Sequence, residues 1–317
     1  MKVNIQLWVA LLMLCLIAFK PMVCFAQDGR DSLSTLPSSQ DDIMDLLLKD
    51  EKDKKPQFIS NAFKSSRVIQ GHSMEMIGEG VLDFRLLHRF GMIKDGWRNM
   101  FGLDQASMRL GFDYGLSKNL TIGIGRTNYL KEWDAFVKWR LVHQRKNYQA
   151  IPFSVLWISG MTLNTTPFAS GRINYFTSKL GFYHQCIIGR KFSKHFTLQV
   201  SPTLVHLNLV ELKSDKNDMF ALGVGSRIRL TNRTSLVLDT HPILYGARSN
   251  YHQWPLSIGL DIETGGHVFQ LHVSNARGMN ERAFIAETFQ TWSKGEIQFG
   301  FNMSRVFTIK KNTSESF

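Results

Sequence analysis

Charged side chains recur at every second position in several segments of this sequence, and they are the residues whose chemistry needs explaining. In segment 106–116, Arg109 and Asp113 alternate with Met108, Leu110 and Phe112. Alternation of this kind predicts a β-strand with one apolar and one polar face. Applied to the other segments, it places one set of charges on the polar face: Asp83, Arg85, Arg89, Arg109, Asp113, Asp134, Lys138, Arg140, Arg227, Arg229, Asp239, Asp261 and Glu263.

These mixed charges support two interpretations if the polar face lines an interior. Buried charges need partners, because isolating one costs several kcal/mol, so they could form ion pairs that stabilise a partly filled lumen. The alternative is a slightly anion-preferring channel or binding cavity, with guanidinium groups at its constriction. A small anionic solute is then a candidate partner. The sequence leaves both interpretations open.

Catalytic and cofactor chemistry have weaker support. Asp239 and His241 are two residues apart on one strand face, as in a hydrolase that acts on lipids at a membrane. His72 and Ser73 are adjacent and would face opposite sides of a strand, and no Gly-x-Ser-x-Gly motif occurs. The ten His residues lack compact ligand spacing, and no haem-attachment motif is present. We therefore predict no enzyme activity, no cofactor and no metal site.

The elements that position these charges are strands of an antiparallel transmembrane β-barrel. The longest apolar run, 7–19, is too short for a membrane-spanning helix, which excludes a multi-helix membrane protein. A membrane barrel has its apolar face toward lipid and its polar face toward the lumen. Period two predicts about twelve strands: 79–90, 106–115, 120–128, 133–143, 151–163, 178–191, 195–209, 219–230, 234–242, 254–263, 267–275 and 294–309.

The connections between these strands alternate in length. The short ones are 116–119, 144–150, 193–194, 231–233 and 264–266, and the long ones are 91–105, 164–177, 210–218, 243–253 and 276–293, with 129–132 as the exception. Short periplasmic turns and long extracellular loops are typical of outer-membrane barrels. An even strand number places both termini in the periplasm. Segments 67–76 and 281–292 could be two further strands, giving fourteen, or segments folded into the lumen or an outer loop.

The chain of 317 residues also divides by composition. Residues 1–26 resemble a secretory signal, with Lys2 before the apolar run and Cys24-Phe25-Ala26 at the cleavage site. Residues 27–60 are predicted to form a polar, acidic leader, which could contain a short helix. The barrel covers 61–309, and 310–317 is a polar tail. Cleavage of the signal leaves Cys186 as the only cysteine, which excludes an internal disulfide.

Several ordered motifs resemble a Bacteroidota family of predicted outer-membrane β-barrel proteins of unknown function. The matching residues are 67–73, 80–85, 88–91, 101–106, 120–126 and 299–307, and the similarity spans about 45–309. The resemblance implies one barrel in the outer membrane of a Gram-negative bacterium. It implies no activity.

The formal net charge of +12 predicts that the protein contacts an acidic molecule. No nucleic-acid motif is present, so we expect basic loop residues such as Lys94 and Arg98 to contact outer-membrane lipid and lipopolysaccharide. The barrel-insertion machinery is the other expected partner. The function predicted is a porin-like passive channel, a binding protein or a structural protein. The alternatives are a lipid-acting outer-membrane hydrolase and a soluble ligand-binding β-barrel.

Overall fold

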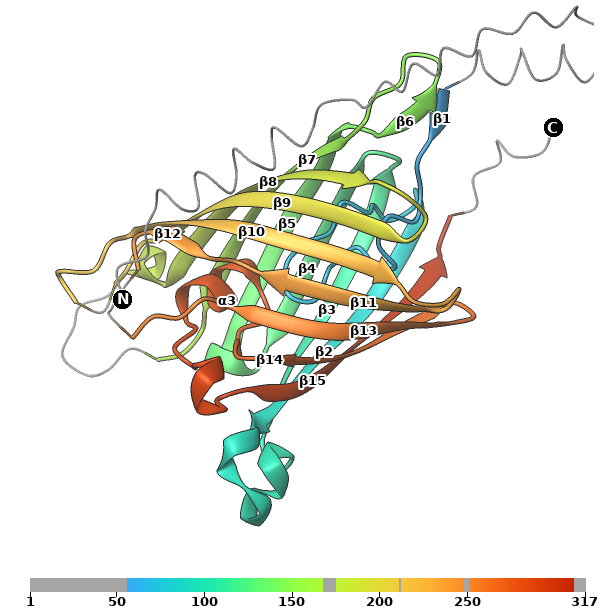
Figure 1. Ribbon diagram of the computed structural model, residues 1–317. Coiled ribbons are helices and arrows are strands. Elements are labelled where there is room, and N and C mark those ends of the chain that lie inside the picture. Colours follow the sequence, from blue (N-terminus) through green and yellow to red (C-terminus); the bar gives the residue numbers. More distant parts are fainter. Residues whose placement is uncertain (1–55, 168–174, 211, 248–250, 311–317) are drawn as a thin grey trace, which may run out of the picture. The chain divides into compact units, whose positions relative to one another are not determined.

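The computed structural model describes residues 56–167, 175–210, 212–247 and 251–310, all within the compact unit 53–317. The expected signal peptide and most of the expected leader and tail lie outside these residues. Twelve antiparallel strands close into one barrel (Figure 1). They are β2 (Val81–Met92), β3 (Ala106–Ser117), β4 (Leu120–Thr127), β5 (Glu132–Val142), β7 (Ser154–Asn164), β8 (Leu180–Lys191), β9 (Phe196–Leu207), β10 (Asp218–Arg229), β11 (Thr234–Thr240), β13 (Leu256–Thr264), β14 (His267–Ser274) and β15 (Gln298–Thr308).

Neighbours in the barrel are neighbours in the sequence, and the ring closes where the last strand meets the first. β15 pairs with β2 from Gln298 opposite Met92 to Thr308 opposite Val81. Closure leaves no unpaired edge, which the absence of water in hydrocarbon requires. The predicted all-β fold with twelve wall strands is confirmed, and the strand centres agree with the period-two pattern.

Three short strands lie outside the regular wall. β1 (Pro56–Phe58) pairs with β6 (Arg145–Asn147), which lies in the connection between β5 and β7. β12 (Ile243–Tyr245) continues the pairing of β10 beyond the end of β11. Alternation did not indicate these strands, because three residues are too few to show a period.

Within the described residues, the helical elements all lie in connections between strands. They are η1 (Ile93–Asp95), η2 (Trp97–Gly102), η3 (Tyr129–Lys131), η4 (Phe176–Lys179), α3 (Glu281–Ala286) and η5 (Trp292–Lys294). No helix in the described part of the chain is long and apolar enough to cross a bilayer.

The two rims of the barrel differ as expected from connection lengths. The ends of β3, β8, β10 and β13 join the next strand through tight turns, and we call this rim the short-turn end. The opposite rim, the long-loop end, carries the connections that contain η1, η2, η4, α3 and η5. The β4–β5 connection, formed by Asn128 and η3, is the one short connection at the long-loop end.

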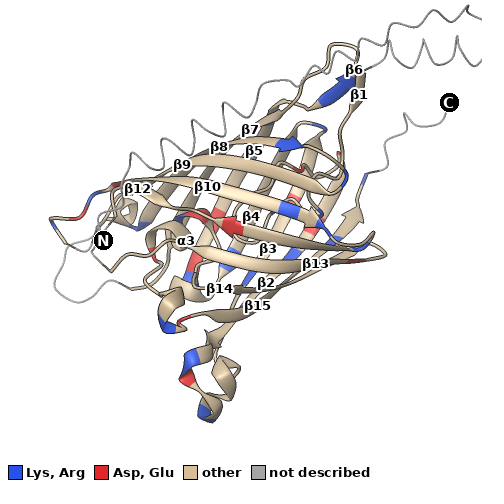
Figure 2. Ribbon diagram, viewed as in Figure 1, with Lys and Arg blue, Asp and Glu red and all other residues tan. Residues whose placement is uncertain are grey.

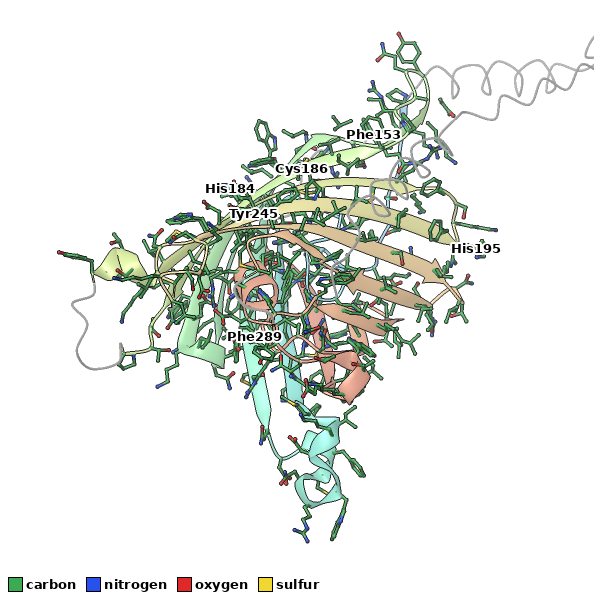
Figure 3. The ribbon with its side chains drawn as sticks, turned by 60° about the vertical axis from the view of Figure 1, so that its left-hand side comes forward. Phe153, His184, Cys186, His195, Tyr245 and Phe289 are labelled. Carbon is green, nitrogen blue, oxygen red and sulfur yellow. The ribbon has the colours of Figure 1, made fainter. Side chains whose placement is uncertain are left out.

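The orientation of side chains in the wall is that of a membrane barrel. Phe112 on β3 is 48% exposed, whereas Arg109 on the same strand is fully buried. Val137, Leu260 and Phe269 are likewise exposed on their strands, so large apolar side chains cover the outside. A soluble barrel would have the reverse arrangement. Figure 3 labels His184 and Cys186 on the outer side of β8.

Two segments that contribute no strand to the wall fill the lumen. The first, residues 59–79, is called the N-terminal insert, and it is buried almost throughout from Ala62 to Ile77. The second, residues 275–291, is called the C-terminal insert and contains α3, whose six residues are all buried. Figure 1 shows both within the ring of strands. They include the ambiguous segment 67–76 and all but the last residue of the ambiguous segment 281–292. Both are therefore lumen segments and leave the wall at twelve strands.

Candidate functional site in the barrel lumen

The N-terminal insert runs into the lumen from the short-turn end and returns to it. It begins beside the β5–β7 connection, where the Ile59 amide donates to the Gln144 carbonyl at 2.9 Å. It ends just before Gly80, whose φ of +73° and close approach to Lys310 suit a residue without a side chain. Between these points the chain makes a tight hairpin, closed by the Val68 amide donating to Gly71 at 2.9 Å.

One carboxylate holds the tip of this hairpin. Oδ2 of Asp239 accepts three consecutive backbone amides, from Ile69 at 3.2 Å, Gln70 at 2.7 Å and Gly71 at 2.9 Å. Asp239 is the penultimate residue of β11 at the long-loop end and is 2% exposed. The insert therefore reaches from one rim almost to the other. A carboxylate that accepts several amides is a strong, charge-assisted anchor.

Wall residues on β2, β14 and β15 fix the same hairpin. Arg89 donates to the Gln70 side-chain oxygen at 3.1 Å and to Asn302 at 2.9 Å. Gln70 in turn donates to the Ser274 hydroxyl at 3.2 Å. Asn302 donates to the Ile69 carbonyl at 3.1 Å. Apolar contacts add to these, since Phe63, Val68 and Met74 belong to the buried apolar cluster of the lumen.

The C-terminal insert enters from the opposite rim and meets the first insert. Glu281 on α3 accepts from Arg67 of the N-terminal insert at 2.9 Å, and His72 lies 3.4 Å from the same carboxylate oxygen. Asn280 caps α3 by accepting the Ala283 amide at 2.8 Å. Arg282 pairs with Glu132 of the wall at 2.6 Å. The two inserts thus form a continuous filling of the lumen.

The structure places most of the predicted lumen charges inside the barrel, and five of them form ion pairs with one another. Arg85 lies 2.9 Å from Asp83 and 3.3 Å from Asp113, and all three are buried. Arg109 and Asp134 form a bidentate pair at 2.8 and 2.5 Å. Figure 2 shows the acidic and basic positions on the wall strands.

The remaining predicted residues have other surroundings. Asp261 accepts from Gln270 at 2.6 Å, and Lys138 and Arg227 donate to the N-terminal insert. Arg140 and Arg229 are half-buried near the short-turn end. Glu263 is partly exposed there and pairs with Lys64 of the insert.

A cavity of about 350 Å³ adjoins the N-terminal insert near the short-turn end. Its lining combines insert residues with wall residues, including Ser65, Glu75, Asp83, Glu263 and Ser304. The insert therefore has unfilled space on one side.

Asp239 and His241 do face the same way, as their spacing predicted, with 3.5 Å between a carboxylate oxygen and the ring nitrogen. Both are buried, and the imidazole contacts the Phe284 ring of α3 at 4.8 Å between centroids. Asp239 is engaged by the insert amides, so this pair is structural here. No group of three or more His, Cys, Asp or Glu among the described residues could hold a metal ion.

Sequence reasoning missed the residues of the inserts that meet these charges, above all Arg67, Glu75 and Glu281. Alternation cannot find them, since none lies in a strand. The signal that was present is the unassigned status of 67–76 and 281–292, two charged and partly apolar segments within a chain of regular strands.

The family of this chain follows from a direct comparison. The family model described as a membrane-bound β-barrel domain (DUF5777) matches residues 63–307. The chain therefore belongs to this family of membrane-bound β-barrel domains. This agrees with the resemblance to an uncharacterised barrel family and does not favour the soluble barrel.

Solved structures of similar topology include porins and a translocator. The NanC porin shares 9% identity, with 71% of this chain and 98% of the porin covered and a TM-score of 0.45. The KdgM porin shares 7%, with 72% and 98% covered and a TM-score of 0.43. The translocator domain of autotransporter NalP from Neisseria meningitidis shares 13%, with 84% and 96% covered and a TM-score of 0.34. A comparison with curated proteins finds no match.

Proposed function

We propose that this chain is a passive channel of the outer membrane of a Gram-negative bacterium, held closed by the N-terminal insert. The observation that carries the proposal is that the insert contributes no strand to the wall. Its departure would clear its part of the lumen, with the C-terminal insert left in place, without breaking a hydrogen bond between wall strands. A barrel of twelve strands whose inner face is polar is then wide enough to hold water and small solutes.

The connection lengths support one orientation in the membrane. We propose that the short-turn end faces the periplasm, which puts β1 and residue 310 on that side. The long-loop end then faces outward, where basic loop residues such as Arg98 and Lys213 would meet lipopolysaccharide phosphates. Insertion in this orientation would require the barrel-insertion machinery.

A reversible disulfide between insert and wall tests whether the insert is the gate. A Cβ atom at position 189 on β8 would lie 3.4 Å from the Cβ of Met74. Disulfide-linked residues have Cβ atoms about 3.5–4.5 Å apart. We therefore choose the double substitution Met74→Cys and Gly189→Cys, made in a Cys186→Ser background so that the two new thiols pair with each other.

The measurement is conductance of the purified full-length protein in planar bilayers. We expect the oxidised protein to stay closed and the reduced protein to open, with the single Met74→Cys variant unaffected by reductant. Equal conductance before and after reduction would show that the insert is not the gate. Absence of any conductance in both the oxidised and the reduced state would favour a structural role for a permanently filled barrel.

A further inference from the structure

Four basic side chains of the wall converge on the N-terminal insert near the short-turn end. Lys138 and Arg140 lie on β5, Lys191 ends β8, and Arg227 lies on β10; we call these four the basic cluster. Lys138 is 1% exposed and Arg227 is 4% exposed. Burying cations to this degree requires strong acceptors nearby.

The basic cluster lacks the carboxylate partners that other lumen cations have. Arg85, Arg109 and Arg282 each form an ion pair with a wall carboxylate. Among the described residues, no member of the basic cluster has a carboxylate oxygen within 4.0 Å of its charged nitrogens. Nε of Arg140 is buried and has no hydrogen-bond partner in the same part of the chain.

Three members of the basic cluster donate to backbone carbonyls of the insert, and the fourth, Arg140, contacts the His143 ring at 3.4 Å. Lys138 donates to Glu75 at 2.5 Å and to Ser66 at 3.2 Å. Lys191 donates to Ser60 at 2.7 Å. Arg227 donates to Ala62 at 2.9 Å and to Asn61 at 3.1 Å. Five carbonyl oxygens of the insert thus accept hydrogen bonds from basic side chains that would otherwise face an open lumen.

The insert also brings one carboxylate to the same place. The Glu75 side chain accepts the backbone amides of Ala62 and Phe63. It interacts electrostatically with all four members of the basic cluster: Lys138, Arg140, Lys191 and Arg227. One carboxyl group and five carbonyl oxygens thus face four basic side chains, which is the set of oxygen acceptors that a bound oxyanion would provide.

We propose that the basic cluster is a binding site for a small soluble oxyanion, a phosphate or a carboxylate-bearing solute, and that the N-terminal insert occupies this site as a built-in substitute ligand. Ammonium and guanidinium groups bind charged oxygen more strongly than neutral carbonyl oxygen. An oxyanion therefore competes with the insert for the same donors. This inference rests on the proposed channel function for its consequence, which is that solutes admitted to the open lumen are anions.

Removing the charge of the substitute ligand tests the site directly. Glu75→Gln keeps the side chain's size but leaves the basic cluster short of one negative charge. We expect inorganic phosphate to bind this variant at least about tenfold more tightly than the unmodified protein, measured by calorimetry on full-length protein in detergent at low ionic strength. Glu296→Gln is the matched control, because Glu296 pairs with Lys94 at the opposite rim.

A second pair of substitutions identifies the donors. In the Glu75→Gln background, Lys138→Met with Arg227→Met should abolish phosphate binding. Migration of the unheated protein on a denaturing gel reports whether each variant is a folded barrel. A folded Glu75→Gln variant that binds phosphate no more tightly than Glu296→Gln would overturn the site.

Failure of the site and failure of the channel give different results. Enhanced phosphate binding in Glu75→Gln, with no conductance from the reduced disulfide variant, would keep the anion site and overturn the channel. Conductance in that reduced variant with a reversal potential that shows no preference for anions would keep the channel and overturn the anion site. Both proposals predict phosphate binding together with an anion-selective reversal potential.

Discussion

At the scale of single residues, the lumen is a set of charges whose partners come from different parts of the chain. Arg109 pairs within the wall, since Asp134 lies on β5 two strands away. Arg67, in contrast, depends on Glu281, more than two hundred positions further along the chain. Each pair is buried, so loss of one partner leaves an uncompensated charge.

The Arg109–Asp134 pair gives a prediction at this scale. Asp134→Asn keeps the shape but removes the charge, so we expect the free energy of unfolding to fall by about 3–5 kcal/mol. Urea unfolding of the protein in lipid vesicles measures this. Glu296→Gln removes a charge from a partly exposed pair and should leave the unfolding midpoint nearly unchanged. Equal behaviour of the two variants would contradict the role of burial.

At the scale of elements, the two inserts are short segments that depend on the wall for their conformation. α3 has only six residues, which is too short for a helix to be stable alone. Its cap at Asn280, its pairing with Glu132 through Arg282 and its close packing against Gly278 compensate for that shortness.

Gly278 tests how closely α3 is packed. A Cβ atom at this position would lie 2.5 Å from the backbone of Ala283 and Phe284. Gly278→Ala should therefore displace α3 from its packed position. We expect the Phe284 and Glu287 amides, which donate within the helix at 3.0 Å, to lose their protection from hydrogen exchange. Amides in β7 and β8 should keep their protection. Unchanged hydrogen exchange at the Phe284 amide would show that the C-terminal insert accommodates the added methyl group without displacing α3.

At the scale of the whole molecule, the barrel has its apolar residues outside and its charges inside. This inversion is what the membrane requires, because lipid replaces water as the solvent of the outer face. The same sequence pattern in water would have put Phe112 and Leu110 in a common core. Membership of a membrane-bound barrel family and the exposure of these side chains agree on this point.

Arginine substitutions along β3 test the inversion. Leu110 lies in the middle of the outer face and is 42% exposed, and Leu116 lies near the short-turn end of the same strand. Leu110→Arg should cost about 2–4 kcal/mol of folding free energy in lipid vesicles, and Leu116→Arg about 0–1 kcal/mol, since the cost falls toward the interface. An equal cost at both positions in urea titrations would argue against a lipid-facing wall.

The sequence by itself determined the wall of this protein. The alternation of apolar and polar residues predicts the twelve strands and which face of each strand is apolar, because every strand in a lipid-facing barrel must repeat the same two-residue pattern. The alternation of short and long connections follows from where these strands begin and end. The sequence also placed Arg109, Asp134, Lys138 and Arg227 on the inner face.

Only the tertiary structure decided what fills the lumen. Segments 67–76 and 281–292 have no period, since neither belongs to a repeating lattice, and their partners are distant in the chain. That Asp239 holds the tip of a hairpin, and that Glu75 reaches the basic cluster, depends on closure of the sheet, which brings β5, β8, β10 and β11 around one interior. Contacts of this kind are set by the folded geometry and leave no local mark in the sequence.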